Sequence, residues 1–225
     1  RQRIVFYKQG RRYRYLFVDT MRQCVRDTVP SRKKPGRRTK ITKQFLCWCL
    51  LMLRHRVIPL ILLDGYSVVK TIKFDIRRNL GNPIVVSRIY NSRNVDELFL
   101  LDIDASKERR GIDLQTVNSV ASQCFMPVTV GGGLHSCEDI SKVLQAGADR
   151  VSINTALWRN PSFLEKAVSV FGSQCIVVSL DVKMDNTGKY ILHSHANLQI
   201  GLSLESCISL LTRIQVGEIL INNVD

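Results

Sequence analysis

The sequence predicts an α/β fold, specifically a (β/α)8 barrel, from three observations. Short apolar runs, which are typical of strands buried on both faces of a parallel sheet, alternate with helix-period segments along most of the chain. Asn-Pro pairs at 82–83 and 160–161 supply a cap and a first-turn proline for two of the helices. Gly131, Gly132 and Gly133 join one strand to the next helix. With 225 residues the chain lies near the lower size of such a barrel.

Six strands, five helices and one hairpin are expected in order along the chain. The strands are expected at 57–63, 98–103, 127–130, 150–153, 176–180 and 218–221, and the helices at 82–91, 112–123, 137–146, 161–171 and 204–214. Ser136 and Asp139 have the spacing of a capping box at one helix start. Asn186-Thr-Gly188 is typical of a turn, so a hairpin is expected within 183–201. Six strands are two short of a barrel, so we expect truncation after about strand six, with an unpaired edge on that strand.

Charge divides the chain into two regions. Residues 1–51 carry 15 Lys and Arg against 2 Asp and Glu, whereas residues 52–225 carry 18 against 17. We therefore expect a basic extension at 1–51, disordered or foreign to the fold, and a C-terminally incomplete barrel at 52–225. Residues 1–43 are expected to pack little against the barrel. A nucleic-acid-binding arm and a targeting peptide are alternative interpretations, and nucleic acid is not the favoured partner.

Composition also indicates the compartment and the absence of a cofactor. The seven cysteines form no CxxC pair, which is typical of reduced thiols in a cytoplasmic protein. The apolar run at 45–53 is too short to cross a bilayer, so no membrane association is predicted. His193 and His195 share a strand face, but no third metal ligand is evident, so surface histidines are favoured over a metal site.

Polar residues at predicted strand ends form the candidate active site, because in this fold the chemistry lies at the carboxyl ends of the strands. The three glycines expose backbone N–H groups before a helix, which suits a phosphate. Asn154 and Thr155 follow the next strand and are expected to complete one anion site with them. The alternative for the glycines is a tight turn that needs positive φ.

Carboxylates follow two other strands. Asp102, Asp104 and Ser106 come after the second strand, and Asp181 ends the run at 176–180. Burying a carboxylate at the end of an apolar strand costs free energy. We therefore favour a functional role for Asp181 over a structural role as a cap of the next segment.

Several separated motifs carry a resemblance to a known family over about residues 52–225. They are Arg56-Val-Ile-Pro59, the segment 96–106, the glycine stretch, Val151-Ser-Ile-Asn-Thr155, Phe171-Gly-Ser-Gln174 and Val177-Val-Ser-Leu-Asp181. The stretch resembles HisF, the cyclase subunit of imidazole glycerol phosphate synthase. It looks most like the WbuZ-type paralogues associated with sugar amidation in surface-polysaccharide gene sets. The resemblance implies a HisF-like (β/α)8 barrel.

The resemblance also implies roles for individual residues. It places a phosphate on the glycine loop and on Asn154-Thr155, and it makes Asp181 one of two catalytic carboxylates. Lys70 matches a loop lysine near the substrate, with a solvated lysine as the alternative. Thr129 and Asp102 are also expected to bind the substrate or its phosphate.

One family carboxylate is absent from this chain. Leu62 occupies the position of the first catalytic aspartate, and the segment is one residue shorter before Asp64-Gly65. Asp64 shares strand parity with Leu62 but lies about 7 Å further along a strand. The departure puts cyclase activity on the histidine-pathway substrate in doubt.

At the opposite strand ends, the resemblance implies a charged ring that gates ammonia. The matching residues are Arg56, Glu97, Arg150 and Glu218, and Asp149 would face a HisH-like glutaminase partner. A structural ion-pair cluster is the alternative, because two cations and two anions satisfy one another when buried.

Three functions remain open from the sequence. The first is a synthase-type subunit of a glutamine-dependent amidotransferase for surface-sugar amidation, working with a glutaminase and a sugar amidotransferase on a phosphorylated small molecule. The second is the cyclase subunit of histidine biosynthesis. The third is an inactive barrel or a nucleic-acid-binding protein.

Overall fold

The computed structural model describes residues 3–8, 56–72, 76–194, 200 and 202–224. The chain divides into two units, one made of residues 1–13 and 57–225 and the other of residues 14–56. All elements below belong to the first unit. Of the second unit only Arg56 is described, and most of the predicted basic extension lies outside the described residues.

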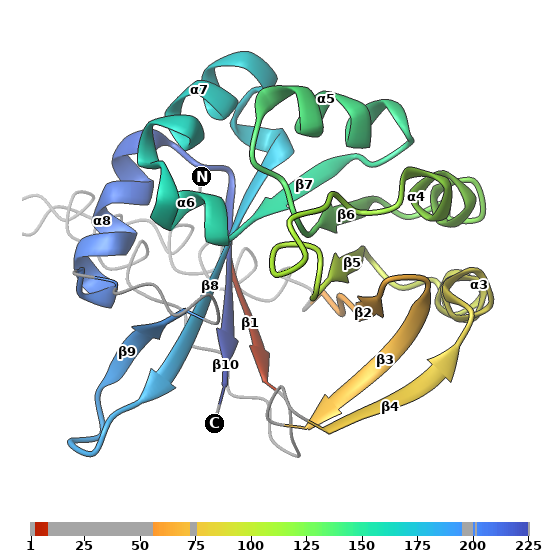
Figure 1. The fold of residues 1–225 in the computed structure, drawn as a ribbon, viewed down its shortest axis with the longest axis horizontal. Coiled ribbons are helices and arrows are strands. Elements are labelled where there is room, and N and C mark those ends of the chain that lie inside the picture. Colours follow the sequence, from red (N-terminus) through yellow and green to blue (C-terminus); the bar gives the residue numbers. More distant parts are fainter. Residues whose placement is uncertain (1–2, 9–55, 73–75, 195–199, 201, 225) are drawn as a thin grey trace, which may run out of the picture. The chain divides into compact units, whose positions relative to one another are not determined.

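Six parallel strands follow one another across the sheet in chain order (Figure 1). They are β2 (Leu60–Asp64), β5 (Leu98–Asp102), β6 (Val128–Gly131), β7 (Arg150–Ile153), β8 (Ile176–Met184) and β10 (Glu218–Asn223). All six were predicted, and their order is that of a (β/α)8 barrel. Over the described residues the sheet has two ends, β1 and β4, and does not close.

Five helices cover one face of this sheet (Figure 1). They are α3 (Pro83–Ser92), α4 (Leu114–Ala121), α5 (Cys137–Gln145), α7 (Pro161–Phe171) and α8 (Leu204–Ile214). The side chain of Asn82 caps α3 by accepting from the N–H of Ile84, and Ser136 and Asp139 form the predicted capping box of α5. The predicted helices are therefore confirmed, with ends that differ by a few residues. The short helix α6 (Thr155–Arg159) and the 3₁₀ turn Ser173–Cys175 were not predicted.

Two antiparallel hairpins extend the sheet. The predicted one is formed by the end of β8 and by β9 (Tyr190–His193), and Asp185 closes its turn by accepting from the N–H groups of Thr187 and Lys189. The second, β3 (Ser67–Ile72) with β4 (Ile76–Gly81), was not predicted. Every residue of β4 is exposed, so the segment has no alternation of buried and polar positions.

The edge of β10 is covered, contrary to expectation. Strand β1 (Arg3–Lys8) pairs with β10 in parallel from one end of β10 to the other. The expectation of an unpaired edge on this strand is therefore wrong. The expectation that residues 1–43 pack little stays a prediction, because most of them lie outside the described residues. Pairing with β1 satisfies backbone groups that an open edge would expose.

Apolar side chains pack on both faces of the sheet. The larger cluster lies between strands and helices and includes Leu98, Val151, Leu164 and the fully buried Cys207 of α8. On the opposite face Phe99, Val177 and Leu220 pack together. We call this opposite side the inner face; because side chains alternate along a strand, Glu218, Leu220 and Asn222 of β10 all lie on it.

Candidate functional site

Asp181 is the centre of a hydrogen-bonded network on the inner face of β8. The residue is 7% exposed, and its carboxylate accepts from two asparagine side chains. Asn154, directly after β7, donates from Nδ2 to Oδ2 at 2.8 Å, and Asn222 of β10 donates from Nδ2 to Oδ1 at 2.8 Å. Trp158 donates from Nε1 to Oδ1 of Asn154 at 3.4 Å. Three neighbouring strands thus fix the orientation of one buried carboxylate.

Asn222 was missed by the sequence analysis. Its Cα is paired with that of Asp181 in the parallel register of β10 and β8, which brings together residues 41 positions apart. Counting two steps along the strand from Glu218 to Leu220 to Asn222 is the signal that could have placed it on the inner face.

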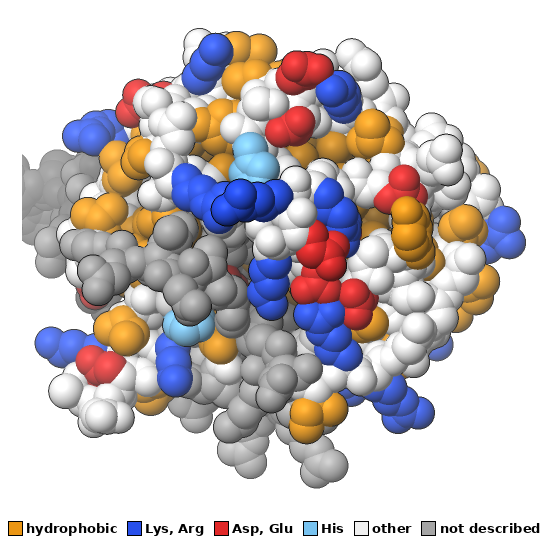
Figure 2. All heavy atoms as spheres, in the orientation of Figure 1, with side chains coloured by type: hydrophobic (Ala, Val, Ile, Leu, Met, Phe, Trp, Pro, Cys, Tyr) orange, Lys and Arg blue, Asp and Glu red, His pale blue; other side chains and the backbone are white. Residues whose placement is uncertain are grey.

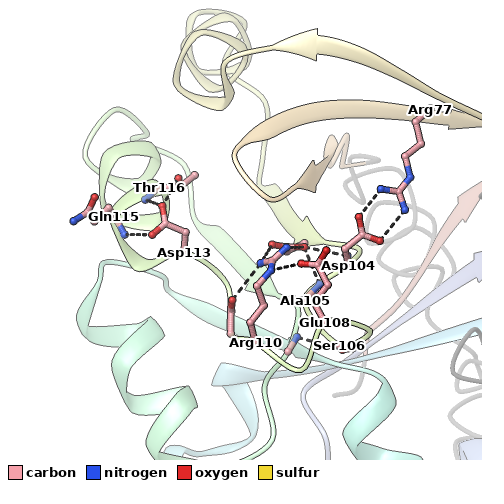
Figure 3. Close-up of polar contacts among 12 residues, drawn as sticks. Arg77, Asp104, Ala105, Ser106, Glu108, Arg110, Asp113, Gln115 and Thr116 are labelled. Atoms are coloured by element: carbon pink, nitrogen blue, oxygen red, sulfur yellow. Dashed lines mark hydrogen bonds and ion pairs between the residues drawn. The ribbon is translucent and has the colours of Figure 1, made fainter.

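A second network lies at the ends of β2 and β5. Arg77 reaches from β4 to Asp104, and its guanidinium donates two hydrogen bonds to that carboxylate, with Nη2 at 2.7 Å from Oδ1 (Figure 3). Nη1 of Arg77 also lies 2.8 Å from Oδ2 of Asp64. These hydrogen bonds hold the pKa of Asp104 below its ordinary value and raise the pKa of Arg77. The hairpin is thereby connected to two strand ends.

Asp102 is engaged within its own loop. Its side chain is fully buried, and Oδ1 accepts from the backbone N–H groups of Asp104 and Ala105, each at 3.0 Å. Nη1 of Arg110 lies 2.5 Å from Oδ2, and Nε of Arg110 lies 2.5 Å from Glu108 (Figure 3). Asp102 therefore orders the loop after β5.

The glycine loop packs against that same loop. A Cβ added at Gly132 would lie 2.5 Å from the carbonyl oxygen of Asp102, and one at Gly133 would lie 1.9 Å from that of Arg110. Both glycines have positive φ, at 119° and 67°. The N–H of Gly133 donates to Oγ of Ser106 at 3.3 Å. Close approach of two backbones thus requires glycine here, independently of any ligand.

The other residues expected at the anion site take different positions. The Asn154 side chain binds Asp181 and Trp158, and no hydrogen bond of the described residues joins it to the glycines. Thr155 begins α6 and is half-buried. Thr129 is buried in β6, and Lys70 is exposed on β3 rather than in a loop. Convergence of this set on one phosphate stays a prediction.

An open hollow of about 480 Å³ adjoins the ion pairs, and charged side chains of both signs gather on the face shown in Figure 2. The hollow is lined by Asp64, Gly65, Tyr66, Glu108, Arg110, Gly111 and Asp113. A hydrogen bond from Thr116 lowers the pKa of Asp113 in this lining. Asp181 is buried and does not line the hollow, so the hollow and the Asp181 network are separate features.

Three of the four proposed gate residues meet at the opposite strand ends. Nη1 of Arg150 lies 2.9 Å from Glu97 and 2.9 Å from Glu218, and both carboxylates are buried. Arg56 is exposed and belongs to the other unit, so its place relative to this cluster is not described. Asp149, expected to face a partner, accepts from the N–H of Val128 at 2.8 Å.

Leu62 occupies the inner face of β2 and is 8% exposed. Its Cα is paired with those of Leu101 and Val69 in the neighbouring strands. The position at which the resemblance implies a carboxylate is therefore apolar and nearly sealed.

The described residues contain neither a cluster of metal ligands nor a membrane-spanning helix. No group of three or more His, Cys, Asp or Glu side chains there is arranged to hold a metal ion. Within the same residues, no helix has both the length and the apolar character needed to cross a membrane.

Comparison with known proteins gives the family. Residues 56–225 match the model of the family described as "Histidine biosynthesis protein". Imidazole glycerol phosphate synthase subunit HisF of Clostridium botulinum is 41% identical over 172 residues, covering 76% of this chain and 68% of that protein. The HisF subunit of an Exiguobacterium species is 45% identical over 148 residues, covering 66% and 58%. The chain therefore belongs to the histidine biosynthesis protein family, as a homologue of HisF.

Proposed function

We propose that this chain acts as a HisF-type cyclase subunit of imidazole glycerol phosphate synthase, using ammonia and a phosphorylated ribonucleotide. The observation that carries the proposal is the Asp181 network, because a HisF homologue has its implied catalytic carboxylate buried and fixed by two amide donors. The second of the functions left open by the sequence is thus preferred over the first.

Asp181 is the acid/base group in this proposal. A positioned carboxylate can move protons to and from a reacting group, and its efficiency depends on being held at the correct place. Asn154 and Asn222 provide that placement from β7 and β10 without adding charge.

The phosphate is proposed to bind at the glycine loop and the start of α6. Backbone N–H groups at positive-φ glycines and at helix starts favour anions. Ser136 already uses its side chain to cap α5, so the contribution of the loop to the ligand is through its backbone.

Ammonia is proposed to come from a HisH-like glutaminase partner and to enter at the Arg150 cluster. Glu97, Arg150 and Glu218 lie on the inner face at the strand starts, whereas Asp181 lies on the same face toward the strand ends. Ammonia, a small neutral molecule, would travel along the inner face from the Arg150 cluster to Asp181. Arg56 is included in this gate on the resemblance alone.

The test is turnover of the phosphorylated ribonucleotide with an ammonium salt as the nitrogen source. Asp181→Asn preserves shape and removes the proton-transfer group, so we expect turnover to fall about 10²–10⁴-fold. Asp185→Asn, which alters a half-buried carboxylate in the β8–β9 turn, is the matched control and should retain turnover. Equal turnover of the native and Asp181→Asn proteins would remove Asp181 from the mechanism.

Leu62 favours a second candidate, the synthase-type subunit of a surface-sugar amidotransferase. Without the other carboxylate the chain would still fold and still contain the Arg150 cluster, as a subunit that delivers ammonia requires. Absence of ribonucleotide turnover together with binding to a glutaminase would support this candidate.

A further inference from the structure

Asn222 uses only one end of its amide in the described network. Nδ2 donates to Asp181, but Oδ1 is buried and has no hydrogen-bond partner, which is true of no other buried side-chain oxygen or nitrogen in the described part of the chain. A buried acceptor without a donor costs folding free energy, so such atoms are rare in folded proteins.

The orientation of this amide follows from chemistry. Both oxygens of Asp181 already accept from asparagine nitrogens, and a carboxylate oxygen cannot donate to a carbonyl. If the Asn222 amide were reversed, its oxygen would face the Asp181 carboxylate. Oδ1 is therefore the atom that remains without a partner.

The surroundings indicate what kind of donor can reach this atom. Asn222 shares the inner face of β10 with Glu218, which binds Arg150, and with Leu220, which packs on Phe99 and Val177. Oδ1 is sealed from bulk solvent. Any donor must displace neighbouring atoms to reach Oδ1. Ammonia, which is about the size of water and carries three N–H groups, requires a smaller displacement than a substituent of a large substrate.

We propose that Asn222 is a positioning residue with two tasks: its Nδ2 orients Asp181, and its Oδ1 accepts an N–H of ammonia. Ammonia is thereby held beside the carboxylate, with its lone pair free. This inference rests on the proposed use of ammonia by the Asp181 site and adds to it the residue that binds the nitrogen source.

The direct test observes the carboxamide carbon of Asn222 by NMR in the full chain labelled with ¹³C-asparagine. The probe is ammonium chloride at a pH at which part of it is ammonia. We expect the Asn222 resonance to move and to saturate. Tetramethylammonium chloride has no N–H and should leave it unmoved.

Asn223 supplies the matched control, because it is the same residue type one position along and on the other face of β10. Its carboxamide resonance should not move. An Asn222 resonance unchanged by ammonium, or one that moves together with that of Asn223, would overturn the proposal. If the Asn222 resonance moves only with the phosphorylated ribonucleotide, the donor is that substrate and the assignment to ammonia is wrong.

Steady-state kinetics separate the orienting of Asp181 from the binding of ammonia. Asn222→Ser keeps a hydroxyl that can donate toward Asp181 and lacks the carbonyl. Loss of one net hydrogen bond should raise the KM for ammonia about tenfold, with a much smaller change in kcat at saturating ammonia. Equal loss in kcat with an unchanged KM would indicate a structural role only. Absence of turnover in the native chain would count against the proposed cyclase function, and the NMR titration would still decide the role of Asn222.

Discussion

Arg77 is the side chain that connects the β3–β4 hairpin to the ends of β2 and β5. Its hydrogen bonds lower the pKa of Asp104 below the ordinary value. A carboxylate with a lower pKa in the folded state contributes stability above the unfolded pKa, about 4, and loses that contribution as the pH falls through the lower folded pKa. The ion pair is thus a source of acid sensitivity.

We therefore expect Arg77→Gln to lower the free energy of unfolding at pH 7 and to change it less at acidic pH. Urea unfolding at pH 7 and at about pH 3 measures the difference. Arg78→Gln alters an exposed neighbour on the same strand and should change neither value by more than about 0.5 kcal/mol. A pH-independent effect of Arg77→Gln would show that Asp104 is not the responsible group.

Leu62 is the residue that most directly limits the proposed chemistry. Leu62→Asp would place a carboxylate on the inner face of β2, and we expect it to raise ribonucleotide turnover by about 10²-fold if the rest of the site is intact. Recovery is expected to be partial, because the segment before Asp64 is one residue short. Leu62→Asn, which has the same shape without the charge, is the control. Native turnover equal to that of an ordinary HisF would mean that Asp181 suffices.

In the loops after β5 and β6, close contact between two backbones leaves room only for glycine at some positions. Gly133→Ala would place a Cβ 1.9 Å from the carbonyl oxygen of Arg110, at a φ of 67°. We expect a loss of about 2–4 kcal/mol in the free energy of unfolding. Gly188→Ala shares the positive φ, but nothing lies within 4 Å of the added Cβ, so only the conformational cost of about 1–2 kcal/mol should appear. Equal losses would exclude the clash as the cause.

Strands buried on both faces were predictable from the local sequence, whereas the fully exposed β4 was not. The apolar runs of β5 and β8 and the capped helices have periodicities that depend only on local burial. β4 is exposed throughout, and β1 pairs with a partner more than 200 positions away in the sequence. Neither property leaves a local signal, so the β3–β4 hairpin and the covered edge of β10 could not be predicted.

At the scale of the whole molecule, the Arg150 cluster joins β5, β7 and β10. Arg150→Met would leave Glu97 and Glu218 buried without their shared cation, and we expect a loss of about 3–5 kcal/mol. Chemical denaturation measures it. Arg159→Met, at an exposed position of α6, should cost less than about 0.5 kcal/mol. Adding Glu97→Gln and Glu218→Gln to Arg150→Met should restore part of the loss; failure to do so would exclude charge burial as its origin.

Some contacts of the candidate site could be predicted from the sequence, and others could not. Arg150 and Glu218 start their strands and Glu97 directly precedes β5, so their meeting follows from strand positions alone. The bonds from Asn154 and Asn222 to Asp181 depend on the register of three strands, and those of Arg77 depend on a hairpin that was not predicted. Register comes from the packing of the whole sheet, which one sequence does not reveal.

The fully buried Cys207 gives the molecule an internal reporter of its own opening. Burial raises the pKa of this thiol to about 11, so near pH 8 only about one molecule in a thousand carries the reactive thiolate even if a reagent could reach it. Alkylation of Cys207 must therefore wait until α8 leaves the sheet. The rate at which this sulfur is modified, compared with that of the half-buried Cys137, records how often that layer of the protein detaches under native conditions.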